Sequence, residues 1–359
     1  MTQTIVVIAA SALARLLYLG AKVGHGGMDE NAYKLQAELV AFHGFLKAPR
    51  MIAGGFLAHL PYLACASGLR ILYLYALALA SMLTDEFKWL SMAAVSSMAG
   101  VACVVFAACI GGHLGGELGA TTAAALVGAS PLCLGLGRRV LVDVPAAATQ
   151  LGVLALATLG PEWWPAVSAA LVVMLLTRES SRTMLLPLAV ALWWLWRDWT
   201  WLVAIGVALP AYAVAIRALL GVWPWRFPTA FVVRVIKREK IPVEHYAMQR
   251  CKGGLHRLVV DLALVSPAVL VAAITSPNPT IVLAVLVMAA YAAPWLEQQI
   301  RSCLVVDLLL RIGVAVTLPW WATCLLLVVD AYVFARAWLR RGVYDPTTYD
   351  LAKAMGMFR

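Results

Sequence analysis

The sequence predicts an all-α, multi-pass membrane protein, and three observations support this prediction. Of its 359 residues, 63% are apolar and only 13% are charged, whereas a soluble globular protein carries about 25% charged residues. The apolar runs are continuous and rich in Ala and Leu, unlike the alternating segments of about ten residues in a membrane β-barrel. At about 20 residues per helical crossing, the chain provides about a dozen spans. These observations exclude a soluble enzyme.

Hydropathy, with tryptophan clusters taken as interface markers, predicts thirteen helices in one transmembrane domain over residues 1–338, followed by a short tail at 339–359. The expected spans are 4–20, 52–68, 70–84, 90–111, 118–136, 144–160, 164–177, 183–197, 201–220, 258–276, 280–296, 302–318 and 320–338. The first run has no basic segment ahead of it and no cleavage site of small residues, so we expect a retained span rather than a cleaved signal.

Two connections, 21–51 and 221–257, are too long and polar to be simple turns. Six apolar residues of the first recur at alternating steps of four and three: Met28, Ala32, Leu35, Leu39, Phe42 and Leu46. This spacing predicts an amphipathic helix lying in the membrane interface. The second connection contains a similar amphipathic segment at 231–240. We therefore expect interfacial helices in both loops.

Counting spans places the charge-rich connections together. The two long loops and the turns at 137–143 and 178–182 fall on one face of the membrane. The opposite face receives short turns, with Arg70 and Arg197 as its few cations. This one-sidedness is expected if the loops build a single site.

The net charge of +10 is carried largely by loops beside a membrane, so phosphate-bearing lipids are the expected counter-ions and nucleic acid is not an expected partner. The seven cysteines are an odd number. Five of them lie in apolar runs without paired spacing: Cys65, Cys103, Cys109, Cys133 and Cys324. We expect buried, reduced packing residues, and neither a disulfide framework nor a zinc pattern.

The acid pair Asp29 and Glu30 follows the first span by about ten residues. A carboxylate held in a partly dry site at the membrane boundary is suited to proton abstraction, because desolvation raises its pKa toward neutrality. The alternative is that Asp29 caps the amphipathic helix, where the helix dipole favours its charge.

Two further charged turns lie on the same face. Arg138 and Arg139 precede Asp143, so the arginines are candidates to hold a phosphate while the acid orients a hydroxyl or a metal ion. Arg178 and Glu179 form the second turn. For both turns the alternative is structural, an interfacial anchor or a helix cap.

Read in order, these pieces resemble the GT-C glycosyltransferases, and more narrowly the branch of protein O-mannosyltransferases and aminoarabinose transferases. The matching motifs are Asp29-Glu30-Asn31-Ala32-Tyr33, Ser130-Pro131, Arg139 with Asp143-Val144-Pro145, and Leu176-Thr177-Arg178-Glu179 followed by Pro187. The resemblance covers roughly residues 1–200. Thirteen spans are also what the aminoarabinose branch implies.

The resemblance implies a polyprenyl-phosphate sugar as donor, Asp29 as general base and inversion at the anomeric carbon. Glu30 and Asp143 would line the acceptor or metal side, with a divalent cation as the candidate cofactor. The implied substrate-binding residues are Tyr33, Arg50, His59, Arg138, Arg139, Arg178, Glu179 and Arg301. Arg301 has a plain interface anchor as its alternative, and the family's usual Pro-Pro before the second span reads His59-Leu60-Pro61 here. Many relatives carry a soluble outer domain after the last span, whereas only the short tail at 339–359 follows it here. Acceptor recognition is therefore expected from loops or from a protein partner.

Charges inside the expected spans leave other functions open. Asp307 and Arg311 are four residues apart and are expected to form an ion pair on one helix face. Asp330 and Arg15 lie in the last and first spans and are candidates to pair across the bundle or to line a polar path. Such residues favour an ion-coupled transporter as the alternative, although the two related halves typical of transporters are not visible. A catalytically silent subunit on the same scaffold is a third possibility.

The sidedness of the loops is predicted differently by two criteria. The positive-inside rule would put the charge-rich face in the cytoplasm, whereas the family works on the outer face. We follow the family, because phosphate binding gives the basic residues another purpose and the opposite loops are too short to show a bias. The expected location is the plasma membrane or its equivalent, with the active-site loops on the non-cytoplasmic face.

Overall fold

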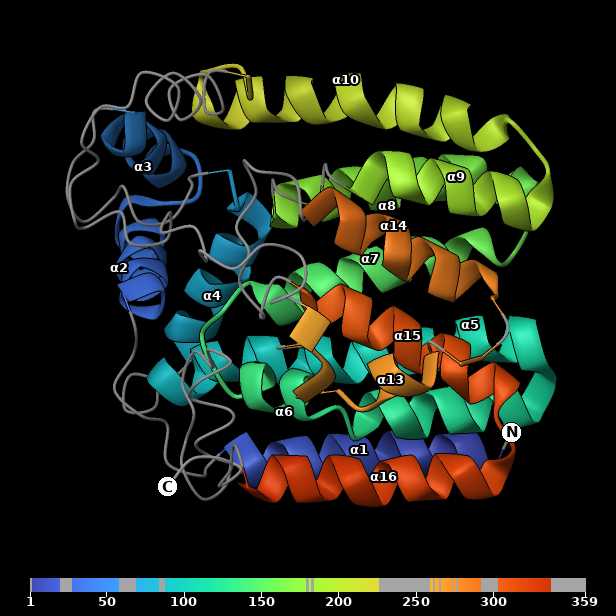
Figure 1. Ribbon diagram of the computed structural model, residues 1–359. Helices are drawn as coiled ribbons and strands as arrows, with labels where there is room; N and C mark the ends of the chain where they lie inside the picture. The colour runs from blue at the N-terminus through green and yellow to red at the C-terminus, as the bar shows by residue number, and fades with distance from the viewer. Residues whose placement is uncertain are drawn as a thin grey trace.

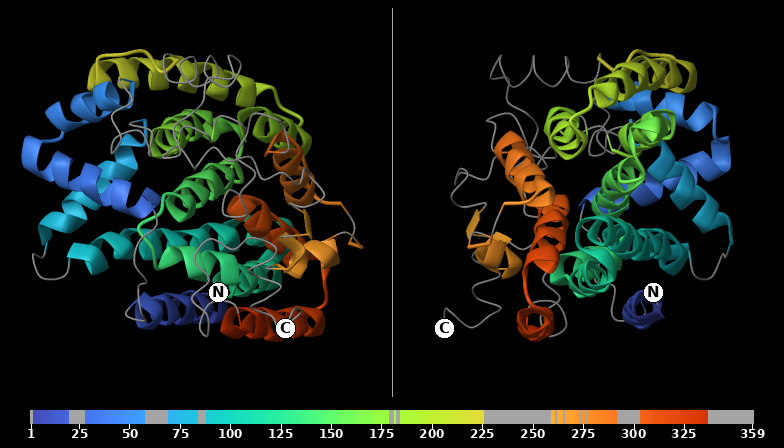
Figure 2. Two further views of the ribbon diagram at one scale, coloured as in Figure 1. Left: turned by 60° about the vertical axis from the view of Figure 1, so that its left-hand side comes forward. Right: turned by 90° about the vertical axis from the view of Figure 1, so that its right-hand side faces the viewer.

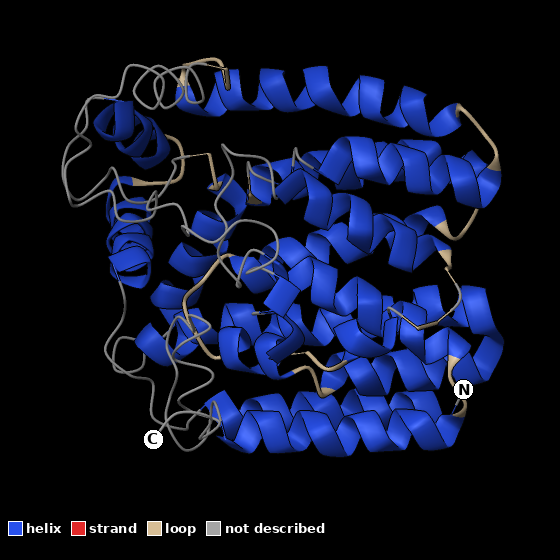
Figure 3. Cartoon of the chain, viewed as in Figure 1, coloured by secondary structure: helices blue, strands red, loops and turns tan. Residues whose placement is uncertain are grey.

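The computed structural model describes residues 2–19, 28–57, 69–83, 88–178, 181, 184–225, 259–260, 262–264, 266–272, 274–275, 277–291 and 303–336. Throughout these ranges the regular elements are helices (Figure 3). They are α1 (Thr2–Leu19), α2 (Met28–His43), α3 (Lys47–Leu57), α4 (Ile71–Leu83), α5 (Lys88–Gly128), α6 (Pro131–Gly137), α7 (Asp143–Ala157), the 3₁₀ turn η1 (Pro161–Trp163), α8 (Trp164–Thr177), α9 (Leu185–Trp196), α10 (Thr200–Leu220), α13 (Ala268–Ala272), α14 (Pro279–Tyr291), α15 (Leu304–Thr317) and α16 (Trp320–Phe334). The predicted all-α class is confirmed.

The long helices form a bundle in which α10 makes one edge and α1 and α16 make the opposite edge (Figures 1 and 2). Among the described residues, α1, α5 and α10 are long and apolar enough to cross a membrane. The outer face of α1 exposes large apolar side chains, including Leu13, Leu16 and Leu17, each more than half exposed. Such a face is stable in hydrocarbon, since lipid tails are as apolar as Leu.

Helix α5 is a hairpin that joins two of the expected spans, 90–111 and 118–136. The chain reverses at Gly115 and Gly116, and Gly116 has φ +64°, a left-handed conformation that favours glycine. The two arms meet at Gly111 and Gly119, where a Cβ on either residue would collide with the backbone carbonyl of the other. Glycine therefore allows both the turn and the close contact of the arms.

The expected span 118–136 is not one continuous helix. Its helix stops at Gly128, and α6 begins at Pro131, because proline lacks an N–H and disfavours helical geometry in the residue before it. Ser130 is accordingly extended, with φ −53° and ψ 116°, and its hydroxyl caps α6. The span expectation overlooked this break.

Helix α2 confirms the helix expected in the first long connection. It ends at His43 because Gly44 adopts φ +86°, so Leu46 lies beyond it. The side that faces the bundle carries the buried residues Ala32, Tyr33, Gln36, Ala37 and Val40. Leu35 and Phe42 of the expected apolar stripe are 38% and 83% exposed. The expected stripe is therefore divided, because Ala32 faces the bundle whereas Leu35 and Phe42 face outward, as in an interfacial helix. The segment 231–240 lies outside the described residues.

The charge-rich connections gather at one end of the bundle, on the left in Figure 1, where α2, α3 and the end of α10 lie and toward which the turn after α6 runs. The turns between α7 and α8 and between α9 and α10 lie at the other end. Arg70 departs from the expectation. Its guanidinium lies 5.5 Å from the ring centroid of Tyr33 in α2, so it belongs to the charge-rich end.

Buried charges inside the bundle form what we call the interior cluster: Asp307, Arg311 and Asp330. The expected pair is confirmed, with Arg311 Nε 2.8 Å from Asp307 Oδ1. One of the two possibilities raised for Asp330 and Arg15, a pair across the bundle, does not form. Asp330 pairs with Arg311, and Arg15 instead lies against Cys133, 3.4 Å from its Sγ. The neutralising partner is one helix away rather than across the bundle.

The cysteine expectation is confirmed in part. Cys103 and Cys133 are free and buried, whereas Cys109 and Cys324 are free but exposed on the outside of the bundle. Their helices turn these positions outward, where an apolar solvent accepts a thiol as readily as a protein core does. Cys65 lies outside the described residues.

Candidate active site

Glu30 joins the start of α2 to the turn that follows α6. Its side chain is fully buried. One carboxylate oxygen, Oε1, accepts a hydrogen bond of 3.0 Å from Arg139 Nε and another of 3.1 Å from the backbone N–H of Val140. A buried carboxylate held by a guanidinium and an amide is stabilised in its charged form. Glu30 thus anchors the Arg138–Arg139 turn against α2.

Asp143 makes the equivalent link between α7 and the end of α8. It is the first residue of α7, and its Oδ1 lies 2.6 Å from Arg178 Nη1, with both side chains buried. Two turns further along α7, Gln150 donates a 2.9 Å hydrogen bond to Ser181 Oγ. We call Glu30, Arg139, Asp143 and Arg178 the end cluster. Two acids face two arginines, so the end cluster is neutral in total.

Aromatic rings line the same region and carry two further cations. Tyr33 of α2 packs edge-to-face on Tyr73 of α4, with ring centroids 5.1 Å apart. The guanidinium of Arg138 lies 4.8 Å from the ring centroid of Tyr18, and Arg70 lies over Tyr33 as described above. Arg138 and Arg70 are half-buried. Tyr33 is 1% exposed and its hydroxyl makes no hydrogen bond within the described residues, so packing is its visible role.

Arg50, a residue of α3, contacts the C-terminal end of α10. Its Nε donates to the carbonyl of Leu219 at 3.3 Å, and its Nη2 donates to the carbonyl of Ala218 at 3.1 Å. The last carbonyls of a helix have no partner within the helix and carry partial negative charge. Arg50 therefore ties α3 to the start of the second long connection, and its implied role with substrate stays a prediction.

Four of the predicted site residues are only partly covered or not covered by the structure. Asp29 stands in the first turn of α2, immediately before Glu30, but its side chain lies outside the described part of the chain. His59, Glu179 and Arg301 lie outside the described residues altogether.

A divalent cation does not fit the described acids of this region. No group of three or more His, Cys, Asp or Glu side chains suited to a metal ion occurs among the described residues. Glu30 and Asp143 are each occupied by an arginine, and a cation would have to displace a buried guanidinium from each.

Lys34, which the sequence analysis did not single out, interacts electrostatically with Glu30 of the end cluster. Its ammonium group lies over the ring of Trp89. Burial lowers the pKa of Lys34 to about 8, although the carboxylates of Glu30 and Glu38 oppose this shift. Both acids are four residues from Lys34 along α2, so the helical i, i+4 spacing was the signal available in the sequence.

Comparisons with known proteins identify the fold. No protein-family model and no curated protein matches the chain. Among solved structures, ArnT from Cupriavidus metallidurans bound to undecaprenyl phosphate is similar, with a TM-score of 0.60 and 14% identity over 98% of this chain and 68% of that chain. The same protein in its apo state gives a TM-score of 0.59 and 15% identity over the same shares of the two chains. The chain therefore has the multi-pass GT-C fold that the resemblance implied.

Proposed function

We propose that the protein is an integral-membrane glycosyltransferase that moves a sugar from a polyprenyl-phosphate carrier to a hydroxyl group of a lipid, glycan or protein. The observation that carries this proposal is the gathering of the α2 start, the Arg138–Arg139 turn and Arg178 at one end of a GT-C fold. Undecaprenyl phosphate, which ArnT binds, is a lipid of the proposed carrier class.

In the proposed reaction, the Asp29 carboxylate removes the proton of the acceptor hydroxyl. The acceptor oxygen then bonds to the anomeric carbon from the face opposite the phosphate. The bond between that carbon and the phosphate oxygen breaks, its electron pair stays on the polyprenyl phosphate, and the configuration inverts. A general base of this kind contributes about 10² to 10⁴ in rate.

The two neighbouring acids have different proposed roles. Glu30 is buried and accepts two hydrogen bonds at one oxygen, so it holds the Arg138–Arg139 turn beside the base rather than taking the proton itself. Arg138 and Arg139 neutralise the charge that develops on the departing phosphate, because fixed cations in a water-poor site act strongly on such charge. Asp143 fixes Arg178 in the same way that Glu30 fixes Arg139.

We place the protein in the plasma membrane or its equivalent, with the end cluster on the non-cytoplasmic face and with a protein partner or loops recruiting the acceptor. Single cysteines introduced in the 221–257 loop of a cysteine-free variant test this sidedness with a membrane-impermeant maleimide. Labelling from outside intact cells is the expected result. Labelling from the cytoplasmic side alone would refute the proposed orientation.

The interior cluster argues against the ion-coupled transporter. Asp307 accepts hydrogen bonds at both oxygens, from Arg311 Nε and from the hydroxyl of Ser130. Asp330 accepts from Arg311 at both oxygens as well. The acids that carry ions in a transporter need access to water, whereas these two carboxylates are fully buried and paired.

The test is turnover of a panel of polyprenyl-phosphate sugars by the purified protein in lipid, comparing wild type with Asp29→Asn. The matched control is Glu38→Gln, a carboxylate-to-amide change at an exposed position of the same helix. We expect Asp29→Asn to lose at least about 100-fold in turnover while folding normally, and the control to keep wild-type activity.

Each other result is informative. Near-wild-type turnover by Asp29→Asn would refute the assigned base but not the enzyme class. If the wild type binds no polyprenyl-phosphate sugar at all, the proposed class is wrong and the silent scaffold becomes the better explanation.

A further inference from the structure

Ser130, directly before the short helix α6, makes hydrogen bonds to two different parts of the fold. The hydroxyl oxygen of Ser130 accepts a 3.1 Å hydrogen bond from the backbone N–H of Cys133, which caps α6. The same oxygen lies 2.7 Å from Asp307 Oδ2 in α15. A hydroxyl has one hydrogen to donate, and an ionised carboxylate can only accept it. Ser130 therefore links the first turn of α6 to the interior cluster.

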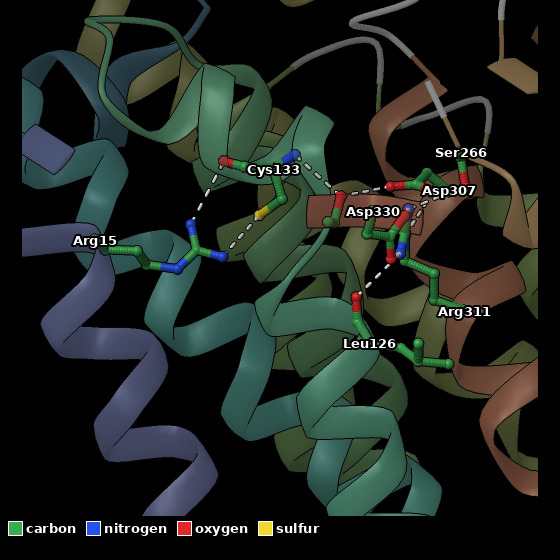
Figure 4. Close-up of polar contacts among 8 residues, drawn as sticks. Arg15, Leu126, Cys133, Ser266, Asp307, Arg311 and Asp330 are labelled. Carbon is green, nitrogen blue, oxygen red and sulfur yellow. Dashed lines mark hydrogen bonds and ion pairs between the residues drawn. The ribbon is translucent and has the colours of Figure 1, made fainter. Parts of the chain in front are cut away.

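The interior cluster is a firm anchor because Arg311 uses all five of its N–H groups (Figure 4). Nε donates to Asp307, Nη1 donates to Asp330 and to the carbonyl of Leu126, and Nη2 donates to Asp330 and to Ser266 Oγ. A guanidinium holds these donors in a rigid plane. Asp307 is therefore held by a guanidinium that is itself bonded to Leu126, Asp330 and Ser266.

The opposite flank of α6 lies against Arg15 of α1. Arg15 donates toward the carbonyl oxygen of Cys133 at 3.5 Å and toward its Sγ at 3.4 Å (Figure 4). A Cβ at Gly137, the last residue of α6, would lie 3.2 Å from Arg15 Nη1. At Gly100 in α5 the guanidinium leaves no room for a Cβ. Helix α6 is thus held between a cation on α1 and a carboxylate on α15.

The seven residues of α6 cover only about 10 Å, and the end cluster begins directly after them. The backbone N–H of Arg139 donates to the carbonyl of Leu136 in the last turn of α6, at 3.2 Å. Val140 then reaches Glu30. Any displacement of α6 is therefore passed to Arg138 and Arg139 through less than two helical turns.

We propose that Ser130 and Asp307 are positioning residues, which hold α6 and thereby set the place of the Arg138–Arg139 turn at the active site. The catalytic consequence rests on the function proposed above. The effect on the position of the Arg138–Arg139 turn does not rest on that function, because it can be measured on the turn itself.

The experiment compares two serines of the same network. Ser130→Ala removes the link between α6 and Asp307, whereas Ser266→Ala removes an equally buried hydroxyl whose hydrogen bond goes to Arg311 and not to α6. Hydrogen–deuterium exchange of peptides over 138–142, on the purified protein in lipid, reports the Val140 N–H bond to Glu30 directly. Peptides over 197–200, where Thr200 N–H donates to Asp198 at 2.8 Å, serve as the internal reference.

We expect Ser130→Ala to speed exchange over 138–142 about tenfold, as the loss of one buried hydrogen bond would. Ser266→Ala and the reference peptides should not change. Ser130→Thr, which keeps the hydroxyl and caps helices, should restore slow exchange. With the proposed donor, Ser130→Ala should lower kcat/KM about tenfold, and Ser266→Ala should leave it unchanged.

Equal acceleration by both alanine variants, or none by either, would overturn the proposal and leave the interior cluster with a role in bundle stability alone. If Ser130→Ala does not fold, Ser130→Cys keeps the volume with a weaker donor and must then give an intermediate exchange rate over 138–142. If no sugar donor is consumed by the wild type, only the proposed function fails, because the exchange comparison stands without activity.

Discussion

The interior cluster and the end cluster both consist of buried acids paired with arginines, but they are built differently. In the interior cluster one arginine pairs with two aspartates, one on each of the consecutive helices α15 and α16. In the end cluster each acid has one arginine, and Glu30 and Arg139 come from segments 109 residues apart. The interior arrangement fixes helices to one another. The end arrangement fixes connections, which are the parts of a fold that carry binding and chemistry.

Removal of Arg311 is expected to have the largest effect, because this one arginine pairs with both aspartates of the interior cluster. Arg311→Leu leaves two buried carboxylates without a cation, and breaking a buried ion pair in this way costs about 3–5 kcal/mol. Thermal unfolding in lipid or detergent measures the loss. Arg197→Leu, at an exposed position, is the control and should change little. An Arg311→Leu protein as stable as wild type would remove the distinction between the clusters.

The end cluster should show coupling between single partners. A double-mutant cycle of Glu30→Ala and Arg139→Ala is expected to give a coupling of about 1.5–3 kcal/mol, the range for hydrogen bonds to charged groups. Chemical denaturation of the four proteins provides the energies. A cycle of Glu30→Ala with Arg178→Ala should be near zero, because those two residues belong to different pairs. Strong coupling in the second cycle would mean that the end cluster behaves as one network.

Asp143→Asn is a milder change at the second pair of the end cluster. Asparagine keeps an acceptor for Arg178 Nη1 but removes the charge, so we expect a loss of about 1 kcal/mol in unfolding free energy. Under the proposed function, sugar transfer should also fall because Arg178 loses its fixed position. Turnover and denaturation measured on the same preparation check both. Loss of stability without loss of turnover would assign the pair a purely structural role.

Lys34 lies outside both clusters and is partly exposed, so its contribution to stability is expected to be the smallest. Its folded pKa of about 8 lies below the ordinary value of about 10.4. Between these values the unfolded chain binds more protons, so stability should rise with pH from about 8 to about 10.4. Because the side chain is partly exposed, the gain is at most about 1 kcal/mol. Lys34→Met should remove this rise, which unfolding measured across the pH range will show. A rise that persists in the variant would assign it to another group.

Much of the fold could be predicted because lipid requires continuous apolar helices. The sequence located α1, α7, α8, α10 and α15 closely for this reason. The break at Ser130 was missed because hydropathy does not change there, although Pro131 carries the signal. Arg70 was misplaced because span counting assigns a residue to a face by sequence order alone, whereas its contact with Tyr33 depends on how the helices pack.

The site could be predicted only as a gathering of connections. Span counting placed the segments of Glu30, Arg139, Asp143 and Arg178 at one end, and the described contacts join them there. Which acid meets which arginine depends on helix rotation and on loop paths, and neither is encoded in local spacing. Asp307 and Arg311 were paired correctly because one helical turn determines their contact, whereas the partner of Asp330 required the three-dimensional bundle.

The interior cluster also constrains how the chain enters the membrane during synthesis. Each unpaired charge at the centre of a span costs about 2.5–3.5 kcal/mol on insertion scales. As α15 emerges from the ribosome, Asp307 and Arg311 can already offset each other one turn apart, but Asp330 arrives 19 residues after Arg311. The most favourable route is for α15 and α16 to leave the translocon together as a hairpin, with the second aspartate already on the guanidinium. A chain released after α15 alone would present to lipid an arginine that has only one of its two aspartates.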